Sequence, residues 1–228
     1  MSLPLIMIAT GLVAFTLGTL TTWPIIHRLC VKLAGATWAL AHDPLTGMLN
    51  RAGLHAALTD AAPAQPVIVA LIDLDDFKHV NDTHGHDLGD QLLVAIGDRI
   101  TDIAALHGGT AARLAGDEYA ALLPARTGDL KRVADTFATI IAQPVTLAAV
   151  DNAVTLTVTA SVGLALADTT DCLTEVGLHR ADIAMYHAKR NGRSRYAVYR
   201  PGMTMPPAQH RRGPRLRDRR QNTGEATA

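Results

Sequence analysis

The sequence predicts an α/β domain that follows a long apolar N-terminal segment. Residues 66–72, Pro-Val-Ile-Val-Ala-Leu-Ile, form a continuous aliphatic run, which is typical of a strand buried on both faces. Residues 110–114 and 119–123 are short apolar runs on either side of an Ala-Gly-Asp-Glu turn, and this arrangement indicates a β-hairpin. Amphipathic helical patterns occur between and after these strands, so helices are expected to cover the sheet.

The N-terminal segment is predicted to be a transmembrane helix over residues 1–28. Leu3 to Ile26 contains no charged residue and exceeds the roughly 20 residues that a membrane span needs. A cleaved signal peptide would carry a charged stretch before its apolar run, and none is present here. Arg28 and Lys32 follow the span, so the positive-inside rule predicts a single-pass inner-membrane protein whose remaining chain lies in the cytoplasm.

Residues 29–42 are predicted to be a helical linker that continues this helix. Two interpretations of the linker stay open, pairing with a second copy in a dimer and a plain connection. Residues 45–58 indicate a turn followed by an amphipathic helix, with Leu49, Leu54 and Leu58 spaced for one face.

Further elements follow in the order of the chain. A helix is expected from about residue 87 to Leu106, where Asp87 and Asp90 would offset the positive end of the helix dipole. The patterns then predict a helix over 128–143 and one long strand over 155–166. A last helix is expected over 173–189, closed by a glycine at its C-terminus.

Acidic residues gather at two points of this predicted fold. Asp73, Asp75 and Asp76 follow the buried strand directly, and Asp117 and Glu118 lie at the tip of the hairpin. Adjacent carboxylates repel each other, so a cation would make the arrangement favourable. A solvated Gly-Asp turn is the alternative for the hairpin taken alone. Acids at the end of a buried strand, facing a hairpin that carries two more, would resemble the layout of a two-metal phosphoryl-transfer site.

The charge of the chain is unevenly distributed. Its 228 residues contain 21 Lys and Arg and 21 Asp and Glu, but six arginines lie after residue 200. The preceding part has 15 basic and 19 acidic residues, a composition that does not favour nucleic-acid binding. Residues 201–228 are rich in Pro, Gly and Arg without periodicity and are predicted to be disordered. Two interpretations of this tail stay open: it contacts anionic lipid, or it is simply solvated.

Five segments resemble, in order and spacing, the successive motifs of the GGDEF domain, the catalytic module of diguanylate cyclases. The resemblance covers Asp43 to about Tyr199 and implies a catalytic domain over residues 43–200. It implies a palm-like fold in which helices flank a central, mostly antiparallel five-stranded sheet. The five segments are Asp43–Arg51, Ile72–Asp90, Arg113–Tyr119, Ala160–Gly163 and Ala181–Arg193.

The resemblance also implies a reaction, in which two GTP molecules condense to cyclic di-GMP with release of two pyrophosphates. Each domain holds one GTP, so the active form would be a homodimer. Asp73 and Asp117 would bind divalent metal with the Leu74 carbonyl, and Glu118 would bind metal or assist deprotonation. Oxygen ligands suit Mg²⁺ or Mn²⁺, two for each GTP half-site. Which acid takes the proton stays open.

The resemblance places the nucleotide as well. Asn81 and Asp90 would bind guanine, and a carboxylate at residue 90 suits GTP because it can accept from both N1–H and the exocyclic amine. Lys78, Lys189 and Arg193 would bind the triphosphate. Cations near the C-terminus of the last helix also stabilise that helix by about 0.3 to 1 kcal/mol, so Lys189 and Arg193 have a structural interpretation too.

The chain departs from the family pattern at three places. Ala115 replaces the first glycine of the turn, before Gly116, and adds a methyl group where a positive φ would be unfavourable. Tyr119 replaces a phenylalanine, which is mild if its hydroxyl finds a partner. The Arg-x-x-Asp of the inhibitory product site would fall at Leu106 and Gly109 and is absent, so no feedback through it is expected. Ala115 supports the alternative of a catalytically degenerate domain that binds GTP or a protein partner.

Overall fold

The computed structural model describes residues 3–61, 66–125, 130–149, 152–167, 176–190, 192 and 195–205. The helices are α1 (Leu3–Ala41), α2 (Arg51–Ala61), α3 (Phe77–His84), α4 (His86–Leu106), α5 (Leu130–Ile141) and α6 (Leu178–Arg190). The strands are β1 (Val67–Leu74), β2 (Thr110–Ala115), β3 (Glu118–Pro124), β4 (Val145–Ala148), β5 (Ala153–Leu156), β6 (Ala160–Ala167) and β7 (Tyr196–Val198).

Five strands form the main sheet in the order β2-β3-β1-β6-β7. The pairs β2/β3, β3/β1 and β1/β6 are antiparallel, and only β6/β7 is parallel. The aliphatic run of β1 lies at the centre and is buried on both faces, as its continuous apolar sequence predicts. The predicted five-stranded, mostly antiparallel sheet is confirmed.

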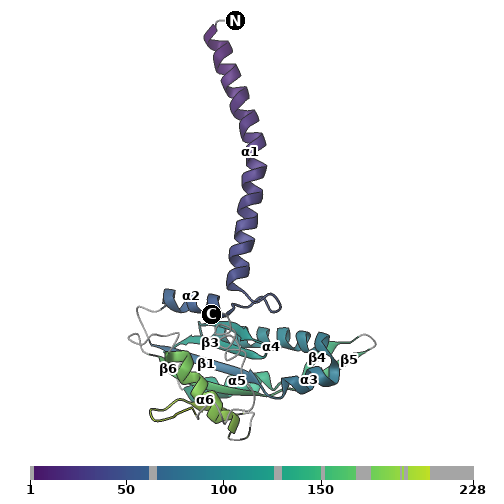
Figure 1. The fold of residues 1–228 in the computed structure, drawn as a ribbon, viewed down its shortest axis with the longest axis vertical. Helices are drawn as coiled ribbons and strands as arrows, with labels where there is room; N and C mark the ends of the chain where they lie inside the picture. Colours follow the sequence, from purple (N-terminus) through teal and green to yellow (C-terminus); the bar gives the residue numbers. More distant parts are fainter. Residues whose placement is uncertain are drawn as a thin grey trace, which may run out of the picture.

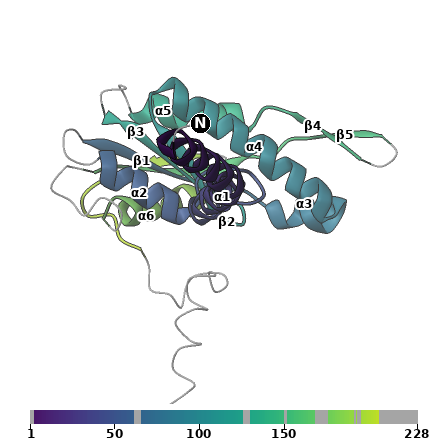
Figure 2. The ribbon, with the colours of Figure 1, turned by 90° about the horizontal axis from the view of Figure 1, so that it is seen from above.

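Helices cover both faces of this sheet (Figures 1 and 2). Side chains of β1 alternate, so that Ile68, Ala70 and Ile72 pack in the core under α4 and α5. Val69 and Leu71 point to the other face and pack in the second core with residues of α2 and α6. The strand is therefore fixed from two sides, and its end at Leu74 is held in one position.

Glycine lets α6 approach the sheet closely. A Cβ on Gly163 of β6 would lie 2.2 Å from the Ala181 carbonyl oxygen and 2.2 Å from the Met185 amide nitrogen. A side chain at this position would force the helix away from the sheet. Gly163 thus sets the distance between α6 and the sheet, and the last turn of α6 carries Lys189.

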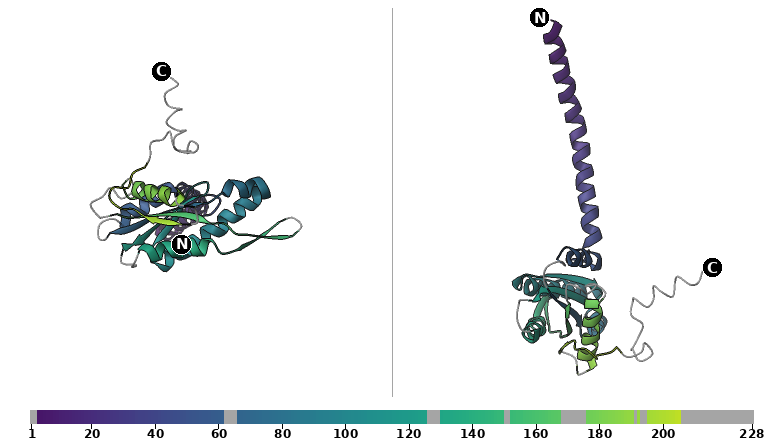
Figure 3. Two further views of the ribbon diagram at one scale, coloured as in Figure 1. Left: turned by 90° about the horizontal axis from the view of Figure 1, so that it is seen from below. Right: turned by 90° about the vertical axis from the view of Figure 1, so that its left-hand side faces the viewer.

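Helix α1 is continuous over 39 residues and projects from the domain (Figures 1 and 3). Large apolar side chains along it are exposed, among them Phe15, Trp23 and Leu29. The predicted continuation of the N-terminal helix through the linker is confirmed. Within the part of the chain that the structure describes, which omits several side chains early in α1, no helix is long and apolar enough to cross a membrane. The transmembrane helix expected over residues 1–28 is therefore not supported.

One sequence prediction about the elements was wrong. The single strand expected over 155–166 is two strands, because β5 pairs with β4 in a separate two-stranded sheet that extends beyond the domain, while β6 pairs with β1 (Figure 1). Residues 77–84 form α3, a short helix that the sequence did not indicate. Residues 206–228, which include the six arginines of the predicted tail, lie outside the described residues.

Candidate active site

The two acidic clusters meet where β1 ends beside the turn between β2 and β3. Asp73 of β1 lies opposite Glu118 of β3 in the antiparallel register, so both side chains project from the same face of the sheet. The Leu74 amide donates to the Asp117 carbonyl oxygen at 3.3 Å and ties the end of the strand to the turn. Acids far apart in the sequence are thereby neighbours in the fold.

Asp117 shows how strongly these acids interact. Burial, followed by the charges of Asp73 and Glu118, raises the pKa of Asp117 from 3.8 to about 6, although the charge of Lys189 acts in the opposite direction. A raised carboxyl pKa means that the ionised form lacks sufficient compensation. The site therefore favours an additional positive charge near Asp117.

Lys189 supplies part of that positive charge. Its Nζ atom lies 2.6 Å from Asp73 Oδ1, and the Asp73 side chain is 13% exposed. The lysine expected to bind phosphate is thus in the same site as the acids. Lys78 is exposed on the first turn of α3, whereas Arg193 lies outside the described residues.

The donor set is suited to a hard divalent cation. Carboxylate and carbonyl oxygens from Asp73, Leu74, Asp117 and Glu118 are the ligands that Mg²⁺ and Mn²⁺ prefer, and the raised Asp117 pKa indicates excess negative charge. Among the described residues, however, no three Asp, Glu, His or Cys side chains already form a metal-binding group. The ammonium of Lys189 is the cation paired with Asp73.

Asp75 fixes the backbone beside these oxygens. Its carboxylate accepts hydrogen bonds from Thr159 Oγ1 and Ser161 Oγ, both at 2.7 Å. Its amide donates to the Thr159 carbonyl oxygen at 2.8 Å. Because Asp75 is anchored by three hydrogen bonds, the preceding Leu74 carbonyl has a defined direction.

The chain then turns sharply into α3. Asp76 has φ 54° and ψ 25° and is the only non-glycine residue with a positive φ in the described part of the chain. Such a backbone is strained, and strain of this kind often occurs at functional sites. Phe77, buried next in the chain, anchors the start of α3.

The predicted guanine-binding residues lie on two consecutive helices. Asn81 is in α3 and Asp90 is in the second turn of α4, and Gly85 joins the helices with φ 84°. Asp90 lines an open groove between α4 and the β4–β5 hairpin. Gln91 holds that hairpin, because its side chain donates to the Ala148 carbonyl at 3.0 Å and accepts from the Ala148 amide at 3.1 Å.

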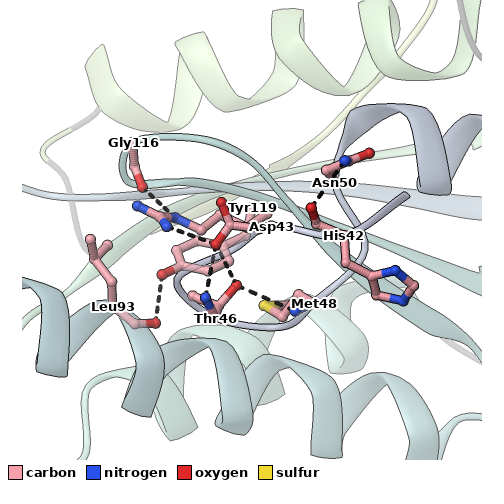
Figure 4. Close-up of polar contacts among 9 residues, drawn as sticks. His42, Asp43, Thr46, Met48, Asn50, Leu93, Gly116 and Tyr119 are labelled. Carbon is pink, nitrogen blue, oxygen red and sulfur yellow. Dashed lines mark hydrogen bonds and ion pairs between the residues drawn. The ribbon is translucent and has the colours of Figure 1, made fainter. Parts of the chain in front are cut away.

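The acidic turn is attached to the end of α1 by an ion pair (Figure 4). Arg113 donates from Nη1 to Asp43 Oδ1 and from Nε to the Gly116 carbonyl oxygen, each at 2.8 Å. Asp43 Oδ1 also accepts from the Thr46 amide at 2.9 Å and from the Thr46 hydroxyl at 2.8 Å. Burial alone would raise the pKa of Asp43, but these hydrogen bonds and the Arg113 charge together lower it below 3.8.

Asn50 connects the end of α1 to the start of α2 through hydrogen bonds of its side chain. Its Nδ2 atom donates to the Leu40 carbonyl at 2.9 Å and to the His42 carbonyl at 3.2 Å. Its Oδ1 atom accepts from the amides of Ala52 and Gly53 and so caps α2. The segment from α1 to α2 is therefore held by side chains at both ends.

Both departures in the turn fit the structure. Ala115 does not have a positive φ, and it pairs with Glu118 at an irregularity in the register between β2 and β3. Gly116 takes the positive φ of 55° instead. Tyr119 is fully buried, and its hydroxyl donates to the Leu93 carbonyl at 2.8 Å (Figure 4). The partner that a tyrosine requires at this position is present.

The structure also describes the two positions at which the family's product site would fall. Leu106 is 80% exposed at the end of α4. A Cβ on Gly109 would lie only 2.1 Å from the Leu122 carbonyl oxygen, so this backbone does not accept an aspartate there. The expectation that feedback is absent stays a prediction.

Sequence reasoning missed several of the residues that hold this site. Asp43 and Thr46 have the spacing of a side-chain-capped turn, which was a usable local signal. Thr159 and Ser161 alternate along the chain and so share one side of an extended segment. The contact between Asp43 and Arg113 joins residues far apart in sequence, and no local pattern indicates it. The contacts that only the structure shows join Asp43 to Arg113, and Asp75 to Thr159 and Ser161.

Comparison with known proteins gives consistent matches. The family model described as "Diguanylate cyclase, GGDEF domain" matches residues 40–195. The diguanylate cyclase TpbB of Pseudomonas aeruginosa is 40% identical over 163 residues, which cover 67% of this chain and 36% of that protein. The bifunctional diguanylate cyclase and cyclic di-GMP phosphodiesterase MucR of the same species is 36% identical over 169 residues, covering 71% of this chain and 24% of that protein. The chain thus spans about a quarter to a third of the length of these curated relatives.

Solved structures agree with the fold. The coiled coil and GGDEF domain of DgcB from Caulobacter crescentus, in complex with c-di-GMP, aligns with a TM-score of 0.69 at 26% identity, covering 81% of this chain and 99% of that one. The GGDEF domain of TpbB from Pseudomonas aeruginosa aligns with a TM-score of 0.61 at 36% identity, covering 70% of this chain and 94% of that one.

Proposed function

Because this chain belongs to the GGDEF family of diguanylate cyclase domains, we propose that it condenses two GTP molecules to cyclic di-GMP and releases two pyrophosphates. The observation that carries the proposal is the meeting of Asp73, Asp117 and Glu118 beside Lys189, at the end of β1. This group of charges suits a triphosphate with its metal ions.

The metal ions would be held by oxygen atoms at the end of β1. Asp73, Asp117 and Glu118 supply carboxylates, and Leu74 supplies a carbonyl whose direction Asp75 fixes. We propose two Mg²⁺ or Mn²⁺ ions for each GTP. When bound, divalent metal neutralises phosphate charge and lowers the pKa of an attacking hydroxyl.

The protein groups would bind and orient the nucleotide. Asn81 and Asp90 lie on α3 and α4, where they would hold guanine, and Lys78, Lys189 and Arg193 would contact the phosphates. Lys189 would exchange its bond to Asp73 for one to phosphate, which frees the carboxylate for metal. Asp117 and Glu118 are the candidates to accept the proton of the 3′-hydroxyl.

The reaction requires two domains. Each 3′-hydroxyl attacks the α-phosphorus of the other GTP, and one domain offers one set of nucleotide-binding residues. We therefore propose a homodimer as the active form, in which two such sites face each other. The long helix α1, which carries exposed apolar side chains, is the element available to set the distance between two copies.

A second candidate function is a domain that binds GTP without converting it. One observation favours it: the ion pair between Lys189 and Asp73 occupies a carboxylate that the cyclase would need for metal. The intact acids at 73, 117 and 118 favour catalysis instead.

One assay separates the two functions. The full chain is incubated with labelled GTP and Mg²⁺, and product is compared with the Asp117→Ala variant and with a control, Asp135→Ala, whose carboxylate is exposed on α5. Cyclic di-GMP from the wild type and the control but not from Asp117→Ala supports the cyclase. GTP binding without product in every variant, also when α1 is replaced by a dimeric coiled coil, would exclude the cyclase and favour the binding domain.

A further inference from the structure

Helices α3 and α4 come unusually close at Asn81 and Gly89. The Gly85 amide donates to the Asn81 carbonyl at 2.9 Å, and the Gly89 amide donates to the Gly85 carbonyl at 3.2 Å, so the two helices are joined by a short, hydrogen-bonded turn. Gly89 is buried in α4. The Asn81 side chain lies directly against it.

The space at Gly89 is occupied by the Asn81 amide. A Cβ on Gly89 would lie 1.9 Å from Asn81 Oδ1 and 3.1 Å from Asn81 Cγ. Exchanging the oxygen and nitrogen of the amide would leave an atom at the same place, so this conflict does not depend on the assignment of the two atoms. Only glycine allows the amide to sit at its observed depth.

The inner atom of the amide has an unusual environment. Asn81 Oδ1 is buried and has no hydrogen-bond partner among the residues that the structure describes. An unpaired buried oxygen costs free energy, and such atoms in native structures require an explanation. Close packing against Gly89 accounts for its position, since the amide lies where none of the described residues offers a donor.

We propose that Gly89 is a positioning residue for guanine recognition, because it sets the depth of the Asn81 side chain. This inference rests on the proposed function, in which Asn81 contacts the base. Contacts between real Cβ atoms and their neighbours essentially never fall below 3.0 Å, so an alanine would displace the amide by about 1 Å. Hydrogen-bond distances vary over roughly 0.5 Å, and a shift of this size therefore breaks the contact with the base or blocks it.

The effect is separable from folding. Alanine is a better helix former than glycine by roughly 1 kcal/mol, so the substitution favours α4 itself. The next contact of the added Cβ, Phe77 Cζ at 3.4 Å, is at ordinary distance. The conflict is with the amide of Asn81, and shortening that side chain removes it.

A double-mutant cycle tests the inference. The full-length wild type, Gly89→Ala, Asn81→Ala and the double variant are titrated by calorimetry with the α,β-methylene analogue of GTP and Mg²⁺, which gives binding without turnover. Gly35→Ala is the matched control, because Gly35 is also helical and a Cβ there meets nothing within 4 Å. Thermal unfolding of each variant reports whether it is folded.

We expect Gly89→Ala to weaken binding by about tenfold, which corresponds to the loss of one hydrogen bond between Asn81 and guanine. Gly35→Ala should bind as the wild type does, and the double variant should bind as Asn81→Ala does, even if Gly89→Ala alone is less stable. If Gly89→Ala binds the analogue with wild-type affinity while Asn81→Ala binds it more weakly, the positioning role is overturned and the guanine assignment of Asn81 stands. The positioning role is also overturned if Gly89→Ala lowers the affinity equally in the wild type and in the Asn81→Ala variant. Unchanged binding by Asn81→Ala would remove the guanine assignment and the inference with it.

Discussion

Replacing Asp117 by asparagine should make the ligand-free protein more stable at neutral pH. The substitution keeps the shape of the side chain and removes its charge. Burial and the charges of Asp73 and Glu118 raise the pKa of Asp117 to about 6. The ionised carboxylate is therefore unfavourable in the folded protein, and the neutral amide avoids that cost.

The size of the effect follows from the pKa. A difference of about two pH units from the ordinary value of 3.8 corresponds to roughly 3 kcal/mol, at about 1.4 kcal/mol per unit. Asp117 is partly exposed, and screening by solvent reduces this to about 1 to 2 kcal/mol. For a chain of this size each kcal/mol shifts Tm by about 2 to 4 °C. We expect Asp117→Asn to melt about 2 to 8 °C higher than the wild type.

The pH dependence has a definite sign. The folded-state pKa lies above the unfolded value, so the stability that protonated Asp117 contributes is complete below pH 3.8 and is lost as the pH rises through about 6. The advantage of the asparagine variant should therefore be small at pH 4 and reach its full size above pH 7. Differential scanning fluorimetry without metal or nucleotide measures it, with Asp135→Asn as the exposed control. An advantage of equal size at pH 4 and pH 8 would refute the electrostatic reasoning.

Three further predictions follow from single contacts. Tyr119→Phe removes the bond from the hydroxyl to the Leu93 carbonyl and should cost about 1 kcal/mol in urea unfolding while product formation is unchanged; unaltered stability would contradict this. Asp43→Asn removes the charged partner of Arg113. It should lower the free energy of unfolding by about 1 to 3 kcal/mol and also lower kcat, because the turn at Gly116 loses its support. A loss of stability without a loss of kcat would show that other contacts hold the turn. Gly163→Ala places a Cβ 2.2 Å from backbone atoms of α6 and should destabilise the fold by about 3 kcal/mol or more in the same unfolding assay, and a wild-type midpoint would speak against this packing.

The strands were predictable wherever local pattern and long-range pairing agree. The aliphatic run before Asp73 became the central strand, and the apolar runs around the acidic turn became a hairpin. The segment from 155 to 166 has the pattern of one strand, because its β-branched residues continue through the connection from β5 to β6. Helix α3 has eight residues, with few apolar positions, so its pattern was too short to detect. The cytoplasmic location stays a prediction.

The site was predictable in its residues but not in its contacts. Motif positions identified Asp73, Asp117 and Lys189, and the fold places them together. The ion pair of Lys189 with Asp73 depends on how closely α6 packs against β6, which the sequence shows only as a glycine at 163. The hydroxyl groups that hold Asp75 come from a strand more than 80 residues later in the chain, beyond the reach of any local pattern.

Unfavourable features of this fold gather around the proposed nucleotide site. The charge of Asp117 is disfavoured by its environment, and Asp76 has a left-handed backbone. Asn81 buries an oxygen that has no hydrogen-bond partner among the described residues. Folding alone would favour the removal of each one. They are tolerated because Asp75 and Arg113 hold the surrounding backbone with charged hydrogen bonds. A bound nucleotide with its metal ions would supply the positive charge that Asp117 lacks, so the same features that destabilise the free protein are the ones that ligand binding would stabilise.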